Sequence, residues 1–184
     1  MARPRTISDQ DILEAAASVF LKEGSQVSTR RIGEHVGLSE AALFKRFGTK
    51  KELLISALSP PGIPSFVLLL GDGPSPDRGL REQLEEIGMS AIAFFRQIVP
   101  RMMVLRSAGI SPMVIFERYD RPPPLVAASA LRDWFRRGQE RGLVRDLPVE
   151  GLASSFLGAL HMEVFTAHLA GCLLYTSPSP RDRG

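Results

Sequence analysis

The chain has 184 residues, of which 44% are hydrophobic and 23% charged, a composition that excludes a disordered protein. Its net charge of +3 at pH 7 does not by itself establish a nucleic-acid partner. No apolar run approaches the ~20 residues that span a bilayer, and the N-terminus lacks the apolar stretch of a signal peptide. A single cysteine cannot form an internal disulfide, so we expect a cytoplasmic protein.

The first 58 residues have the apolar spacing of short helices, and no segment shows the alternation of a strand. A hydroxyl side chain suited to capping precedes each of four predicted helices: Ser8, Ser28, Ser39 and Thr49. Asp11 would complete a capping box with Ser8, and Gly24 would end the first helix.

Proline and glycine residues between positions 60 and 76 separate this head from a longer body. Helices are predicted over residues 77–98, 125–141 and 151–170, with Asp77 capping the first and Pro100 and Pro112 interrupting the chain between the first two. The residues expected to face inward are Leu80, Leu84, Ile87, Ala91, Phe94, Phe95 and Ile98 in the first helix, and Leu125, Ala128, Leu131, Trp134 and Phe135 in the second. The sequence thus predicts an all-α fold, with a three-helix head at residues 6–60 and a helical bundle at 77–171.

Residues 28–47 have the pattern of a helix-turn-helix. Gly37 permits the tight turn, Leu38 fills the core, and Ser39 caps the second helix, whose N-terminal half would face base edges in the major groove. Between Ser28 and Lys51 there are six basic and two acidic side chains, a net charge of +4 against +3 for the whole chain. The positive charge is therefore concentrated where a DNA duplex would dock.

The head resembles the N-terminal signature of TetR-type (tetracycline-repressor-like) transcriptional regulators over residues 7–58. The matching elements follow in order: Ile12 to Phe20, Gly24, Thr29, Ile32, Gly37 to Ser39, Leu43 to Phe47, and Lys50 to Leu54. The body resembles the family more loosely, through Arg141 to Pro148 and the apolar helix after it. The resemblance implies a dimeric repressor that binds a double-stranded DNA operator and is released by a small ligand. No cofactor, metal site, enzymatic activity or membrane partner is expected, because the sequence shows no residue pattern for any of them.

The resemblance also implies which residues contact DNA: Thr29, Arg30, Ser39, Glu40, Ala41, Ala42, Phe44, Lys45, Arg46 and Lys50. Thr29 and Arg30 would reach a base edge or a phosphate, and Lys50 would hold a phosphate. Glu40 would repel phosphate but could accept a hydrogen bond from a cytosine amino group. Phe44 departs from the family, which usually has a phosphate-binding tyrosine there. The alternative interpretation is a solvated face of an ordinary bundle, which is the usual role of a charge run.

The body is rich in methionine and aromatic residues, which provide adaptable apolar surface. By resemblance to the family, some should line a cavity for an apolar or aromatic effector, and the candidates are Phe94, Phe95, Met102, Met113, Phe116, Trp134, Phe156 and His161. Core packing is the competing interpretation for most of them. His161 and His168 lie two helical turns apart, too far to share one metal ion.

A dimer is expected because helix-turn-helix repressors usually read two half-sites. In the family the last two helices of each subunit pair into a four-helix bundle. Residues 151–170 are the candidate for the first of them, with small residues that allow close approach: Ser154, Ser155, Gly158 and Ala159. No second helix is expected, because Cys172 to Asp182 contains two prolines and resembles a translated sequencing adapter. Residues 172–184 are therefore expected to be a non-native tail, with a truncated dimer interface; a natural disordered tail is the alternative.

Two other functions stay open at this point. Within the family, the protein could be an activator or a ligand-independent regulator. From a different class, it could be a small helical enzyme or carrier without DNA binding. The sequence contains no Ser-His-Asp, metal-ligand or phosphate-loop pattern that would support an enzyme. The glycines of Gly71 to Pro74 have the composition of a turn and not of a phosphate-binding loop.

Overall fold

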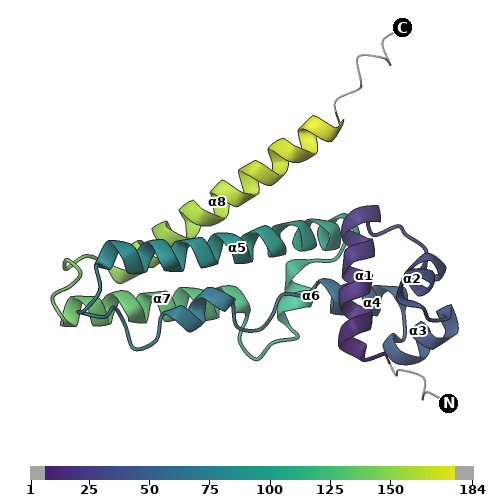
Figure 1. Cartoon of the computed structure of the whole chain (residues 1–184), viewed down its shortest axis with the longest axis horizontal. Helices are drawn as coiled ribbons and strands as arrows, with labels where there is room; N and C mark the ends of the chain where they lie inside the picture. The colour runs from purple at the N-terminus through teal and green to yellow at the C-terminus, as the bar shows by residue number, and fades with distance from the viewer. Residues whose placement is uncertain (1–6, 177–184) are drawn as a thin grey trace, which may run out of the picture. The chain divides into compact units, whose positions relative to one another are not determined.

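The computed structural model describes residues 7–176, and the regular structure in that range is helical throughout (Figure 1). The elements are α1 (Asp9–Glu23), α2 (Thr29–Val36), α3 (Glu40–Phe47), α4 (Lys50–Leu58), the 3-10 helix η1 (Ser65–Leu69), α5 (Leu80–Ser107), α6 (Pro112–Phe116), α7 (Pro123–Glu140) and α8 (Val149–Thr176). The predicted all-α fold is confirmed. Within residues 7–176, no helix is long and apolar enough to cross a membrane.

The described chain forms two compact units. The first contains the residues up to Pro60 together with Pro100–Arg118, and the second contains Pro61–Val99 and the residues from Tyr119 onward. The end of α5 and all of α6 therefore belong with the N-terminal helices. This grouping could not be predicted from local breaks in the helical pattern, because it joins segments that are far apart in the sequence.

The N-caps of the first unit are the ones that the sequence predicts. Ser8 accepts a hydrogen bond from the Asp11 backbone and the Asp11 carboxylate accepts from the Ser8 backbone, which completes a capping box. Ser28, Ser39 and Thr49 each accept a backbone N–H from three residues later. Each such cap contributes about 1 kcal/mol. Helices of eight or nine residues need these caps as well as tertiary packing, because isolated helices of that length are marginal in water.

Apolar side chains from every helix of the first unit meet in its core. The largest of those with 1% exposure or less are Ile12, Phe20, Ile32, Leu43, Leu53, Ile55, Leu58, Leu105 and Ile115. The last two come from the Pro100–Arg118 segment. That segment also reaches α4 through polar contacts, since Arg118 pairs with Glu52 at 2.6 Å and Arg101 Nη1 donates to the Ala57 carbonyl at 3.4 Å. These contacts explain why the segment belongs to the first unit.

The turn between α2 and α3 requires glycine at two positions. Gly37 has a left-handed conformation with φ of 79° and ends α2. The N–H groups of Gly37 and Leu38 both donate to the Gly33 carbonyl, at 2.8 and 2.9 Å. A Cβ atom at Gly33 would lie 2.5 Å from the Leu38 carbonyl oxygen, closer than real Cβ contacts come. Gly37 was recognised in the sequence, whereas the need for Gly33 appears only when α2 folds against its own turn.

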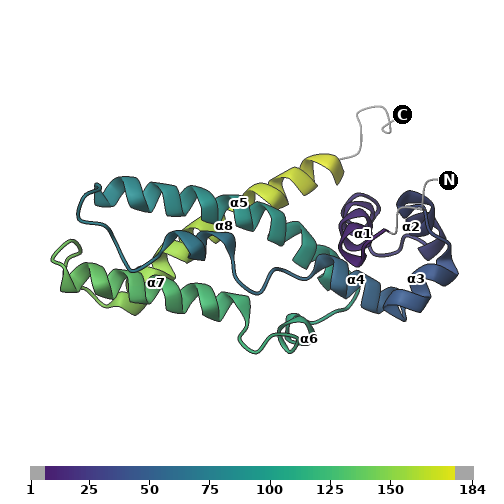
Figure 2. The same ribbon diagram turned by 60° about the horizontal axis from the view of Figure 1, so that its bottom comes forward.

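The second unit packs the first part of α5 with η1, α7 and the beginning of α8. Figure 2 shows α7 beside α8 and η1, in agreement with the contacts between these elements. Its core residues are Phe66, Leu70, Ile87, Ala91, Phe94, Ala127, Leu131, Trp134, Phe135 and Ala153. The short apolar run after Pro64 is thus more than a linker, because η1 places Phe66, which is 0% exposed, in this core.

Three local expectations for the second unit and its connections are wrong. Asp77 is not a cap, because α5 starts at Leu80 and the Gly79 carbonyl accepts the first bond from Gln83. Pro100 lies inside α5 and does not interrupt it. Leu125 is 57% exposed, and Ala127 at 6% exposure takes the core position expected of Ala128. Successive helical residues differ by about 100° in direction, so a one-residue error moves a side chain off the buried face.

The helix α8 is longer than expected, since it continues to Thr176 and not only to residue 170. The remaining part of the predicted tail, residues 177–184, lies outside the described residues.

We predict that Gly33→Ala destabilises the first unit, although alanine is normally the better helix former by about 1 kcal/mol. The added Cβ must displace a backbone carbonyl, so we expect a net loss of about 2 kcal/mol in the free energy of unfolding, measured by urea denaturation with circular dichroism. Gly151→Ala in α8 is the matched control, because its Cβ would meet nothing within 4 Å. Equal stability of the Gly33→Ala and wild-type proteins would contradict this account of the turn.

Candidate nucleic-acid interface

The helix α3 is anchored by one face and exposes the other. Leu43 is 1% exposed, and α3 packs against α2 and α4. The outward positions expected to meet DNA are mostly exposed: Glu40, Ala41, Phe44, Lys45 and Arg46, with Ala42 half-buried. Ser39 caps this helix by accepting the Ala42 backbone N–H at 3.2 Å. The local sequence thus orients an eight-residue helix so that its polar and small side chains face solvent.

Cationic side chains flank α3 on the neighbouring helices. The Arg30 side chain is 83% exposed and pairs with Glu34 one turn along α2, at 3.2 Å. Lys50 is the first residue of α4, directly after the Thr49 cap, and is half-buried. A helix N-terminus combines unpaired N–H groups with a partial positive charge, so Lys50 lies at a position suited to a phosphate.

Thr29 lies inside the helix-turn-helix and not on its surface. It is 8% exposed, and its hydroxyl donates to Glu40 Oε1. This bond links the first residue of α2 to the first residue of α3. Since a carboxylate has two oxygens and about four acceptor sites, Glu40 keeps the capacity to accept a further hydrogen bond.

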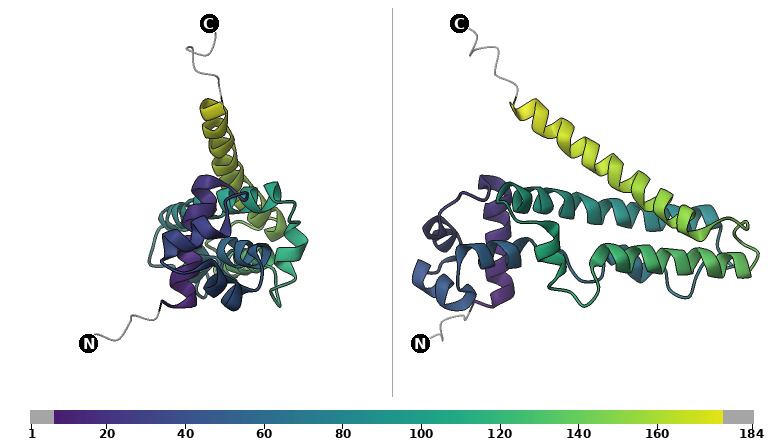
Figure 3. Two further views of the ribbon diagram at one scale, coloured as in Figure 1. Left: turned by 90° about the vertical axis from the view of Figure 1, so that its right-hand side faces the viewer. Right: turned by 180° about the vertical axis from the view of Figure 1, so that it is seen from behind.

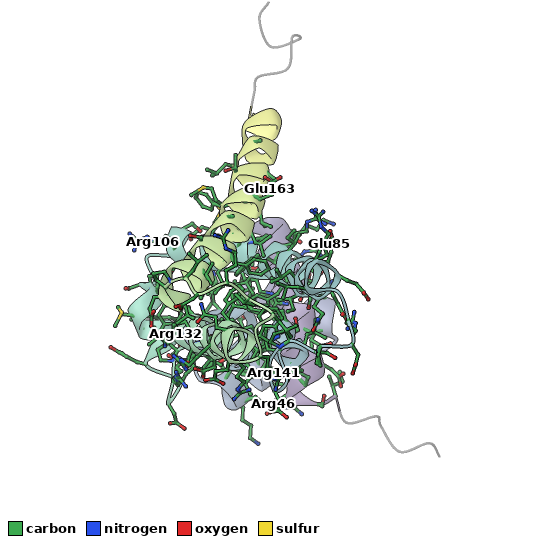
Figure 4. The ribbon with its side chains drawn as sticks, turned by 90° about the vertical axis from the view of Figure 1, so that its left-hand side faces the viewer. Arg46, Glu85, Arg106, Arg132, Arg141 and Glu163 are labelled. Carbon is green, nitrogen blue, oxygen red and sulfur yellow. The ribbon has the colours of Figure 1, made fainter. Side chains whose placement is uncertain are left out.

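Arg46 is tied to the beginning of α1. Its Nη1 donates to the Ile7 carbonyl at 2.7 Å and lies 3.2 Å from Asp9 Oδ1. The side chain, labelled in Figure 4, keeps 31% of its area exposed. The pairing of Asp9 with Arg46 could not be predicted from the sequence, because 37 residues separate the two.

Phe44 lies on the exposed side of α3, where its side chain keeps contact with solvent. The residue is 40% exposed, which is unusual for a phenylalanine that serves only the core. Its ring therefore occupies the surface at which the other α3 residues were expected to meet DNA.

The candidate effector-pocket residues are divided between the two units. In the second unit, Phe94 and Trp134 are buried, with Phe95 and Phe156 half-buried beside the same core. His161 is exposed on α8, with its ring centroid 5.3 Å from that of Phe95 in an edge-on contact. In the first unit are Met102, Met113 and Phe116, of which Met113 is 62% exposed. The structure thus brings together the Phe94, Phe95 and His161 rings within the second unit, whereas Met102, Met113 and Phe116 belong to the first unit.

No metal site is found within residues 7–176, since no three His, Cys, Asp or Glu side chains there are grouped to hold an ion. The histidine nearest the aromatic cluster, His161, contacts two rings: Phe95 edge-on and Phe165 in a stacked arrangement at 6.1 Å.

Residues 12–57 match the family of bacterial regulatory proteins known as the tetR family. Among solved structures, the chain is similar to the TetR family transcriptional regulator PfmR from Thermus thermophilus, at 25% identity over 83% of this chain and 84% of that one, with a TM-score of 0.61. A TetR family transcriptional regulator from Pseudomonas syringae pv. tomato str. DC3000 shares the fold at 20% identity over 89% of this chain and 84% of that one, with a TM-score of 0.57. The fatty acid degradation regulator FadR from Bacillus halodurans also shares the fold, at 15% identity over 91% of this chain and 88% of that one, with a TM-score of 0.58. No curated protein matches the chain.

The family match runs from Ile12 in α1 to Ala57 in α4, so it contains the whole helix-turn-helix and the helices that support it. The solved relatives extend the likeness to the helical body. Taken together, the capped helix-turn-helix and the family match identify residues 12–57 as a DNA-binding domain of the tetR family, and the chain as a whole shares the fold of solved TetR family regulators.

Proposed function

We propose that the protein is a ligand-released repressor that acts in the cytoplasm as a homodimer on a double-stranded operator. The observation that supports DNA binding most directly is the arrangement of side chains around α3. Its apolar side is anchored by buried Leu43, while exposed cations lie on α3 itself and on α2. Phosphate contacts from such cations supply affinity for any duplex, and contacts to base edges supply sequence specificity.

In the proposed complex, the N-terminal half of α3 enters the major groove. Glu40, oriented by Thr29, accepts from a cytosine amino group, and the small side chains of Ala41 and Ala42 fit against thymine methyl groups. Arg30 and Lys45 reach phosphates or base edges at the two sides of the groove. Lys50 and the N-terminus of α4 hold a backbone phosphate.

The dimer is proposed from an apolar face of α8. A stripe of small and apolar residues recurs along it at intervals of three and four, and every member is exposed: Ser155, Ala159, Met162, Thr166 and Leu169. Met162 is 58% and Leu169 37% exposed. Figures 1 and 3 show the second half of α8 diverging from α7, a helix of the same unit. Small residues let two helices approach closely, so a second copy of α8 is the proposed cover.

The proposed effector is apolar or aromatic and contacts the second unit. Support comes from the cluster in which Phe95 contacts both Phe94, at 5.7 Å between centroids, and His161, at 5.3 Å. Aromatic rings there would provide apolar area, and the His161 imidazole would provide one polar contact. Release of DNA would then require that the ligand bind the DNA-free state of the dimer more tightly than the DNA-bound state.

We predict that Arg46→Ala combined with Lys50→Ala lowers affinity for the duplex upstream of the protein's own gene by about 10-fold or more, because two phosphate contacts are lost. The slope of log affinity against log salt should become shallower by about two, as measured by fluorescence anisotropy. The matched control is Arg81→Ala with Arg145→Ala, two exposed cations of the second unit. Full DNA binding by the Arg46/Lys50 double variant would refute this placement of the DNA face.

We predict that Phe44→Tyr strengthens DNA binding, because an exposed ring at this position would gain a hydroxyl able to bond a phosphate. A gain of about 1 kcal/mol, or roughly fivefold in affinity, is expected for one added hydrogen bond. Gel-shift titration measures the effect, with Phe165→Tyr on α8 as the control. A weaker or unchanged affinity would show that this ring does not face the phosphate backbone.

We predict that Met162→Glu raises the dimer dissociation constant about 10-fold or more, because pairing α8 with a second copy would bury an unpaired carboxylate. Sedimentation equilibrium measures the change. Met89→Glu on α5 is the matched control, since Met89 is also strongly exposed, at 69%, but lies away from the stripe. A wild-type monomer at micromolar concentration, or equal effects of the two substitutions, would contradict the proposed pairing face.

A further inference from the structure

The contact between α1 and Arg46 uses one nitrogen of the guanidinium. Nη1 carries two protons; it donates to the Ile7 carbonyl at 2.7 Å and meets Asp9 Oδ1 at 3.2 Å. An arginine has five N–H donors in a planar fork, so Nε and Nη2 keep three of them. Within residues 7–176, the hydrogen bonds and ion pair of Arg46 involve Nη1 alone. The edge formed by Nε and Nη2 is the one that fits two oxygens of a phosphate.

Asp9 is well placed to hold this nitrogen. It is the first residue of α1, directly after the Ser8 cap, and the reciprocal Ser8–Asp11 bonds fix the backbone on which it lies. An acidic side chain in the first turn is also stabilised by the partial positive charge of the helix N-terminus. Arg46 lies in the last turn of α3. The contact therefore joins a fixed helix start to the end of the recognition helix.

We propose that Asp9 is a positioning residue for DNA binding, which holds Arg46 by Nη1 so that its Nε–Nη2 edge clamps one operator phosphate in the register set by α3. This inference rests on the proposed DNA-binding function. A mobile arginine can follow phosphates in many registers and adds affinity for every sequence. An arginine fixed by Asp9 reaches a phosphate only when α3 lies in the position that it adopts on the operator. Its binding energy is therefore gained mainly on the operator, so Asp9 raises the ratio of operator to non-operator affinity.

The carboxylate has a second, opposite effect. Its negative charge lies near the bound phosphate and is 68% exposed at the side chain, so it lowers affinity for all duplexes in a salt-dependent way. Two substitutions of Asp9 separate the positioning of Arg46 from the repulsion of phosphate. Asp9→Asn keeps an acceptor oxygen for Arg46 and removes the charge, whereas Asp9→Ala removes both.

The test compares the full-length wild-type protein with these two variants. An operator is first selected from random-sequence duplexes with the wild-type protein, and affinities for it and for a scrambled duplex are then measured by fluorescence anisotropy over a salt series. We expect Asp9→Asn to tighten binding to both duplexes by about threefold, with a steeper salt dependence and an unchanged affinity ratio. We expect Asp9→Ala to lower the ratio by about fivefold or more, chiefly through weaker operator binding.

Two controls separate positioning from folding. Asp133→Ala removes the acidic partner of another Asp–Arg pair, with Arg136 in α7 at 2.6 Å, and should leave the ratio unchanged. If Asp9 acts through Arg46, the double variant Asp9→Ala/Arg46→Ala should match Arg46→Ala alone in its affinity ratio.

An Asp9→Ala ratio equal to that of the wild type would overturn the inference. So would equal weakening of both duplexes by both Asp9 variants together with a lowered melting temperature, since that pattern marks a contact that serves only folding. If the wild-type protein selects no duplex at all, the proposed function itself fails, which is a distinguishable result.

Discussion

The whole DNA-binding surface depends on how one short helix is held. The helix α3 has eight residues, too few for stability in isolation, and it is fixed by burial of Leu43, by the Ser39 cap and by the tight turn before it. That turn exists only because Gly33 lacks a Cβ atom that would otherwise meet the Leu38 carbonyl. Everything proposed about DNA follows from this constraint, since a recognition helix that shifts by one residue would present different side chains to the groove.

Around the anchored helix, the charged groups are constrained by their own neighbours. The Glu40 carboxylate is bonded to buried Thr29, and the Arg46 guanidinium is bonded to the start of α1. Both groups keep donor or acceptor capacity beyond these contacts. The free protein therefore already orders two side chains that would otherwise lose rotamer freedom on binding DNA, and ordering them in advance lowers the entropic cost of recognition. Lys45 and Arg30, which are exposed on their helices, supply the less directional part of the attraction.

The features that could be predicted from the sequence are those determined within a few residues. The four N-caps and the Gly24 and Gly37 helix ends depend on neighbours at most four positions apart. The contacts that could not be predicted join distant segments: Asp9 with Arg46, Thr29 with Glu40, and Pro100–Arg118 with α4. Thr29 shows the difference most clearly, because its type and position suggested a DNA contact while the packing of α2 against α3 buries it. Leu125 was misplaced because it lies six positions before buried Leu131, about 120° away around the helix, whereas Ala127, four positions before Leu131, lies about 40° away.

The most direct test of the account is hydrogen–deuterium exchange of the wild-type protein with and without a duplex from the region upstream of its gene. The account predicts slower exchange on adding the duplex in the backbone from Thr29 to Glu52, with the α3 amides and the first amides of α4 affected most. It predicts no direct protection in η1 or in the first turns of α5. Protection confined to α5 and α7, with exchange in α2 to α4 unchanged, would contradict the claim that α3 and its flanking cations form the DNA-binding surface.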